Sequence, residues 1–84
     1  MPEKPRIASQ LLRFIEAELL DEPYDQGDPL EAGAVDSLGL EQLVDFAERE
    51  YGVRIADEEM VRENFESVAA LAALIESKLD AAGP

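Results

Sequence analysis

The sequence predicts an all-α fold: a four-helix bundle with a long loop between its first and second helices and a short third helix. Three observations lead to this prediction. Apolar residues recur at intervals of three and four in three separate stretches, which is the spacing of one helix face. The gap between the first two stretches, residues 21–36, is rich in proline and glycine. Only residues 53–55 alternate as a strand would, and no second strand is available to pair with them.

The predicted first helix runs from about Pro5 to Leu20, and a long ordered loop follows it. The apolar face of this helix consists of Ile7, Leu11, Phe14, Ile15 and Leu19. Residues 21–36 then bring together Pro23, Gly27, Pro29 and Gly33. No regular helix or strand tolerates proline and glycine at this density, so a loop is expected.

The second helix is expected to begin at Ser37 or Leu38 and to end at about Tyr51. Its apolar face consists of Leu40, Leu43, Val44, Ala47 and Tyr51. Gly52 follows at the position where a left-handed C-terminal cap is common. Residues 53–55 are expected to form an extended connector.

A short third helix is expected from Asp57, as its N-cap, through about Arg62, with acidic residues in its first turn. Ser67 is expected to cap the last helix. The apolar face of that helix consists of Val68, Leu71, Leu74, Ile75 and Leu79. Residues 81–84 are expected to form a frayed tail.

Residues 1–84 are predicted to form one domain with an ordered core of about residues 5–80. A domain of this length buries only about 60–65% of the surface of its unfolded chain, so its core is small. The bulky residues expected in it are Ile7, Leu11, Phe14, Ile15, Leu19, Leu43, Val44, Tyr51, Ile55, Phe65, Val68, Leu71, Leu74 and Ile75.

The composition is strongly acidic, with 20 acidic residues against 7 basic ones and a formal net charge of −13. Such a charge repels the phosphate groups of nucleic acids and anionic lipids, so neither nucleic acid nor a membrane is an expected partner. The same charge favours encounter with proteins that carry a basic patch.

Cysteine and histidine are both absent. The chain therefore has no disulfide and no thiolate metal site, and no metal site is predicted. It also has no side chain that normally titrates near neutral pH. The first 20 residues contain no unbroken apolar segment of the kind found in signal peptides or membrane spans, so a cytoplasmic location is expected.

Ser37 lies at the predicted junction between the long loop and the second helix, in the tripeptide Asp36-Ser37-Leu38. The N–H groups of the first helical turn and the positive end of the helix dipole would stabilise a phosphodiester on its hydroxyl. Serine is also a preferred N-cap, and in an isolated tripeptide that role would be the simpler interpretation. Any second role for Ser37 depends on the residues around it.

These surrounding residues have a recognisable order and spacing. Gly33-Ala34-Val35-Asp36-Ser37-Leu38 is followed by Leu43-Val44, by Glu50-Tyr51-Gly52-Val53, by Ile55-Ala56-Asp57-Glu58-Glu59 and by Phe65-Glu66-Ser67-Val68-Ala69-Ala70-Leu71. Over residues 7–79 the set resembles the acyl carrier protein family, whose members are four-helix bundles of the kind expected here. The tripeptide alone is a weak signal, and the spacing of the whole set gives the resemblance its specificity.

The resemblance implies that Ser37 keeps its role as a cap and also carries a covalent 4'-phosphopantetheine, with Asp36 and Leu38 as neighbouring cofactor-binding residues. A phosphopantetheinyl transferase would move this arm from coenzyme A onto Ser37, with a magnesium ion near Asp36. The thiol of the arm would hold an acyl or aminoacyl group as a thioester and present it to partner enzymes. The chain itself would then be no enzyme and have no catalytic residues. Its lack of cysteine and histidine agrees with this, because the reactive thiol must then come from a cofactor.

Glu41, Asp45 and Glu48 follow a four-then-three spacing on the second helix, opposite its apolar face. The row can be a solvated face, or, as the resemblance implies, a docking surface for basic patches on partner enzymes. Leu38 and Met60 are candidates for the apolar centre of that surface or for the core. The implied partners are the transferase, an acyl-loading ligase or acyltransferase, and downstream synthase enzymes, with the chain acting as a monomer.

Two residues depart from the pattern of fatty acid carriers. Gly39 stands where many of them have an acidic residue, and Arg49 interrupts the acidic face. The departures favour a free-standing carrier of a specialised pathway, in polyketide, nonribosomal peptide or fatty-acid-like biosynthesis. An aminoacyl or peptidyl carrier loaded by an adenylate-forming ligase is the alternative. Leu40 could line a cargo cleft, although packing is the favoured interpretation.

Three functions of other classes fit less well. An acidic helical interaction module without a cofactor would share the charge and the helices but would not need Ser37. A hydrolase with Ser37 as nucleophile would lack a nearby activating base. A calcium loop would use Asp25, Asp28 and Glu31, but its spacing places Leu30 where such loops require glycine.

Overall fold

The structure, a computed structural model, describes residues 6–82. Within this range the chain forms α1 (Ile7–Phe14), α2 (Ser37–Tyr51), α3 (Arg62–Phe65) and α4 (Val68–Ala82), and no strand. A π-helical segment, η1 (Ile15–Leu20), continues α1, and one turn of 3-10 helix, η2 (Asp57–Glu59), precedes α3. The predicted all-α fold, with its long loop and short third helix, is confirmed.

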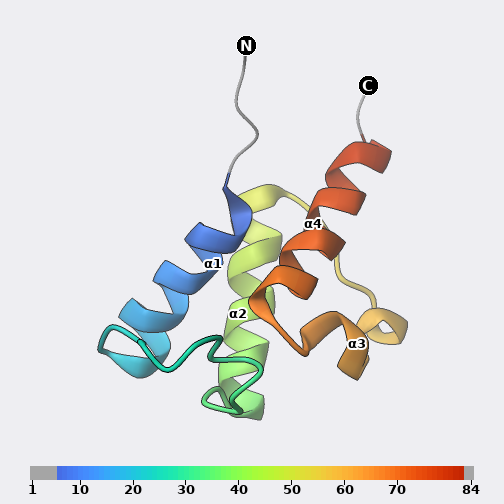
Figure 1. The fold of residues 1–84 in the computed structure, drawn as a ribbon. Coiled ribbons are helices and arrows are strands. Elements are labelled where there is room, and N and C mark those ends of the chain that lie inside the picture. Colours follow the sequence, from blue (N-terminus) through green and yellow to red (C-terminus); the bar gives the residue numbers. More distant parts are fainter. Residues whose placement is uncertain (1–5, 83–84) are drawn as a thin grey trace.

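The apolar faces of the three longer helices meet in one core. α1, α2 and α4 contact one another in pairs, and α3 contacts α4, while the long loop runs across the lower ends of α1 and α2 (Figure 1). The buried hydrophobic residues that form this core are Ile7, Leu11, Ile15, Leu43, Ala47, Ile55, Val68, Leu71, Ala72 and Ile75. Every bulky residue predicted for the core belongs to this cluster or packs against it.

Phe46 adds an aromatic contact between α1 and α2 that the sequence prediction missed. Its ring stacks on Phe14, with centroids 4.4 Å apart, and meets the Tyr51 ring edge-on at 6.3 Å. The Tyr51 hydroxyl donates a hydrogen bond to the side-chain oxygen of Gln10 on α1. Burial, together with the nearby charge of Glu50, raises the pKa of Tyr51, so the hydroxyl keeps the proton that it donates.

The first helical stretch ends at Leu20, as predicted, while its predicted start at Pro5 lies outside the described residues. Its last turns widen, because the N–H groups of Asp21 and Glu22 both donate to the carbonyl of Glu16. Asp21 takes a left-handed conformation with a φ of 60°, which aspartate adopts more readily than most residues. The Glu16 carboxylate then accepts the Tyr24 N–H at 2.8 Å and fixes the start of the loop.

The long loop is held to the bundle by Asp28 and Pro29. One oxygen of the Asp28 carboxylate accepts the N–H groups of Leu30 and Glu31, at 2.9 and 3.2 Å. The other accepts the N–H of Val68, the first residue of α4, at 2.8 Å. Pro29 is fully buried. The loop is ordered, as expected, because one side chain joins it to a helix 40 residues further along the chain.

The exit from α2 follows the sequence prediction. Gly52 has a φ of 67°, and its N–H donates to the carbonyl of Glu48 at 2.9 Å. The left-handed conformation at this position costs glycine little free energy, because glycine has no Cβ. The connector that follows is extended and buries Ile55 in the core.

The predicted bounds of the third helix are wrong. Asp57 is the first residue of η2 and not a cap, and helical structure stops at Glu59 and resumes only at Arg62. The side-chain amide of Asn64 donates to the Glu59 carbonyl at 2.8 Å, and the backbone of Val61 is extended, with φ −114° and ψ 158°. Met60 and Val61 therefore leave the helical path.

Glu59 also ties this segment to α4. Its carboxylate accepts the Ala56 N–H at 2.9 Å and pairs with the Lys78 ammonium at 2.6 Å. Hydrogen bonds from Lys78 and from the Ala56 N–H lower the pKa of Glu59.

α4 begins where the sequence predicts. The Ser67 hydroxyl accepts the Ala70 N–H at 2.9 Å, so Ser67 is its cap. The frayed tail predicted for residues 81–84 is wrong for 81–82, which belong to α4, while 83–84 lie outside the described residues. None of the helices within residues 6–82 is long and apolar enough to cross a membrane.

Candidate functional site

Asp36, and not Ser37, caps α2. The backbone of Asp36 is extended, its carboxylate accepts the Gly39 N–H at 2.8 Å, and its carbonyl accepts the Leu40 N–H at 2.9 Å. Ser37 is the first residue of the helix itself, and its exposed hydroxyl makes no hydrogen bond within residues 6–82. The expected cap role of Ser37 is therefore wrong. The carboxylate of its neighbour fills that role and leaves the Ser37 hydroxyl free for chemistry.

The backbone around Ser37 fits a phosphate group. The first N–H groups of any helix have no partner inside the helix. Asp36 satisfies those of Gly39 and Leu40, whereas the N–H groups of Ser37 and Leu38 donate no hydrogen bond within the described residues. They lie at the positive end of a 15-residue helix. Both features favour an anion on the Ser37 oxygen.

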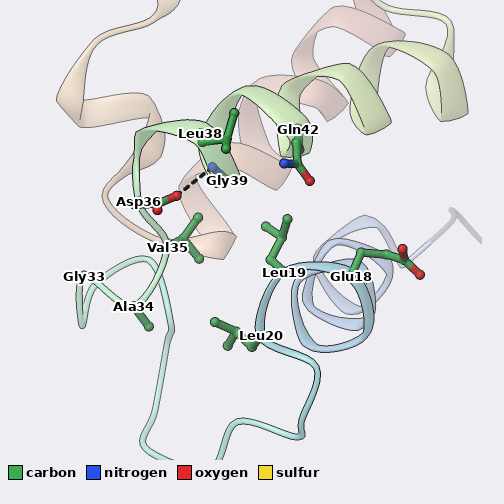
Figure 2. Close-up of a pocket in the computed structure, with 10 residues that line it drawn as sticks. All are labelled: Glu18, Leu19, Leu20, Gly33, Ala34, Val35, Asp36, Leu38, Gly39 and Gln42. Carbon is green, nitrogen blue, oxygen red and sulfur yellow. Dashed lines mark hydrogen bonds between the residues drawn. The ribbon is translucent and has the colours of Figure 1, made fainter.

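A hollow of about 300 Å³ lies between the end of η1, the last residues of the loop and the start of α2. Figure 2 shows Leu19 and Leu20 on one side of it, Val35 and Ala34 on the other, and Asp36, Leu38 and Gln42 along its edge. Both chain neighbours of Ser37 thus line this hollow, which we call the proximal hollow. One wall comes from the end of η1, and the other comes from the last residues of the long loop and the first turns of α2.

Gly39 allows the loop to approach α2 closely at this point. A Cβ at Gly39 would lie 2.8 Å from Cγ1 of Val35 and 3.3 Å from Oδ1 of Asp36, closer than such atoms normally pack. An acidic side chain at this position would displace Val35 or the capping carboxylate. The departure from the fatty acid carrier pattern therefore has a packing consequence.

A second, larger hollow of about 650 Å³ lies between the loop, α2, α3 and the link from α3 to α4. Leu40 and Phe65 form part of its wall, together with the charged residues Glu31, Arg62 and Glu66. Leu40 is half-buried but is not among the residues that pack against the core. The structure thus places Leu40 in a cleft wall, contrary to the favoured interpretation of packing.

The two apolar docking candidates are exposed on separate segments. Leu38 is 63% exposed in the first turn of α2, and Met60 is 42% exposed between η2 and α3. Val61, which the sequence prediction missed, is exposed to the same extent as Met60. None of the three belongs to the core, so each is available to a partner.

The predicted acidic row divides into residues with different roles. Glu41 and Asp45 are exposed, and the Asp45 carboxylate pairs with Arg49 at 3.0 Å. Glu48 is half-buried, and its carboxylate accepts the Ile55 N–H at 2.8 Å, so it holds the connector that follows α2. Glu41 is the one member of the row whose carboxylate makes no hydrogen bond or ion pair within residues 6–82.

The acidic residues of the long loop do not form a calcium site. The Asp28 carboxylate is used by three backbone N–H groups, and the described residues contain no cluster of three or more metal-ligating side chains.

Comparison with protein-family models gives no match, and neither does comparison with curated protein sequences. The structure defines an all-α bundle with an exposed serine at the start of its second helix.

Proposed function

We propose that this chain is a carrier protein that holds an acyl or aminoacyl intermediate as a thioester on a 4'-phosphopantetheine arm attached to Ser37. The observation that carries the proposal is the exposure of the Ser37 hydroxyl. It lies at the start of a helix whose cap is already provided by Asp36. The motif around Ser37 and the landmarks that follow it, which resemble those of acyl carrier proteins, support the identity of the arm.

In the proposed modification, Ser37 Oγ forms a bond to the phosphorus of the pantetheine phosphate. The anhydride bond of coenzyme A breaks, and its adenosine-containing half leaves. The hydroxyl proton passes to a base of the transferase, since this chain has no histidine. The N–H groups of Ser37 and Leu38 would then bind the phosphate.

When bound, the arm supplies the thiol that the sequence lacks. The chain positions the arm and offers surfaces to partner enzymes. Because the transfer uses coenzyme A, the proposed location is the cytoplasm. The departures at Gly39 and Arg49 favour a specialised biosynthetic pathway, with an acyl or an aminoacyl cargo.

Incubation with coenzyme A, magnesium and a broad-specificity phosphopantetheinyl transferase is expected to add one phosphopantetheine, seen by intact mass. Ser37→Ala should gain nothing. Ser77→Ala, which removes an exposed serine of α4, should gain the same mass as the unmodified chain. A folded protein that gains no mass, or a gain that persists in Ser37→Ala, would contradict the proposal and favour an acidic interaction module without a cofactor.

We also propose that the start of α2 docks on basic patches of partner enzymes. Glu41→Lys is expected to slow modification or loading several-fold at low ionic strength and much less at high ionic strength, because salt screens exposed charges. Glu41 is the informative position, since a change at Glu48 would also release the Ile55 N–H.

The matched control for docking is Glu76→Lys, which makes the same change of net charge at an exposed position of α4. The rates of both variants are measured with the transferase or the loading ligase at two salt concentrations. Equal slowing by the two variants would indicate a general charge effect and contradict a docking surface at Glu41.

A further inference from the structure

The proximal hollow begins directly beside the proposed attachment point. Asp36 and Leu38, the residues before and after Ser37, both line it. The second hollow is lined from α2 only by Leu40, one helical turn further on, which is about 5 Å along the helix axis. A group attached to Ser37 therefore meets the proximal hollow within its first few atoms.

Both hollows mix apolar and charged lining residues. The proximal hollow is lined by the apolar residues Leu19, Leu20, Ala34, Val35 and Leu38 and by the carboxylates of Glu18 and Asp36. The Asp36 carboxylate already accepts the Gly39 N–H. The second hollow is lined by Leu30, Leu40 and Phe65 and by the charged residues Glu31, Arg62 and Glu66. The apolar residues of the proximal hollow can contact a methyl-rich group, and its position beside Ser37 favours it over the second hollow.

The local backbone explains how this lining forms. The widened turns of η1 are followed by the left-handed Asp21, and the two successive leucines of η1, Leu19 and Leu20, both line the hollow. Gly39 presents no side chain, so Val35 and Leu19 can lie close to the first turn of α2. A Cβ on Gly39 would be 3.6 Å from Cδ1 of Leu19. Gln42, one turn further along α2, places an amide at the edge of the hollow (Figure 2).

We propose that the proximal hollow holds the pantoyl part of the phosphopantetheine arm, which is the segment next to the phosphate. Its two methyl groups contact Leu19 and Val35, and the Gln42 amide hydrogen-bonds the first amide of the arm. The thiol end, with its cargo, extends beyond the hollow to partner enzymes. This inference rests on the proposed modification of Ser37 and adds to it a resting place for the arm.

The test is an NMR experiment on the modified protein carrying an isotope-labelled arm. Nuclear Overhauser contacts are expected from the pantoyl methyl groups to the methyl groups of Leu19 and Val35. Ala34→Phe is expected to abolish these contacts, because Ala34 is an exposed residue of the hollow wall and a ring there would fill the space. Ala34→Leu serves as a milder filling variant with a partial loss.

The matched control is Ala32→Phe, which makes the same change at an exposed loop position that does not line the hollow. The contacts from the pantoyl methyl groups should persist in this variant. Pantoyl signals like those of free phosphopantetheine, or contacts to Leu40 and Phe65 of the second hollow, would overturn the inference while leaving the proposed function intact. A chain that gains no arm by intact mass would overturn both.

Discussion

Leu71→Ala is expected to lower the free energy of unfolding by about 3 kcal/mol. Leu71 is fully buried in the cluster that joins α4 to α1 and α2. Truncation removes apolar contacts and leaves a cavity, because a close-packed core relaxes only in part. A domain of this size has a total stability of only about 4–12 kcal/mol, so the loss is a large fraction of it. Thermal unfolding should therefore show Tm falling by roughly 15 °C.

Leu38→Ala is the matched control, since it removes the same atoms from a side chain that is 63% exposed. Its free energy of unfolding should change by no more than about 0.5 kcal/mol. Urea unfolding of the two variants measures both values. Similar losses at the two positions would contradict the core as the structure assigns it.

Asp28→Ala should have the second-largest effect, a loss of about 2–3 kcal/mol in the free energy of unfolding. The variant leaves three backbone N–H groups without their acceptor: those of Leu30 and Glu31 in the loop and that of Val68 at the start of α4. Because the last of these joins the loop to the bundle, hydrogen exchange should accelerate at Val68 as well as within the loop.

Two further variants isolate the role of the Asp28 carboxylate. Asp28→Asn keeps one acceptor oxygen and should lose about half as much stability as Asp28→Ala. Asp25→Ala removes another carboxylate of the same loop and should be nearly neutral, because within residues 6–82 that carboxylate accepts only an exposed hydrogen bond from Gln26. If Asp25→Ala and Asp28→Ala unfold alike, the loop is not anchored as described.

The fold was largely predictable because helix periodicity reports burial directly. Apart from Leu40, the residues of the predicted apolar faces belong to the core or pack against it. The local signals at Gly52 and Ser67 were correct as well, since each acts within a few residues of itself. Phe46 was missed because its partner, Phe14, lies on another helix.

The candidate site was predicted in position but not in its arrangement. Ser37 begins α2, as expected, yet both Ser37 and Asp36 are good caps, and sequence preference alone does not choose between them. Glu48 looked like part of an exposed row, because the sequence does not reveal that the chain turns back to bring the Ile55 N–H to its carboxylate.

The sequence by itself determined the number and order of the helices, most of the core and the serine at the start of α2, because each follows from periodicity or from neighbouring residues. Only the tertiary structure decided that Asp28 joins the loop to α4, that Asn64 and Lys78 hold Glu59 where the third helix was expected to continue, and that a hollow opens beside Ser37. These features depend on contacts between segments whose distance and orientation are fixed only when the core has packed.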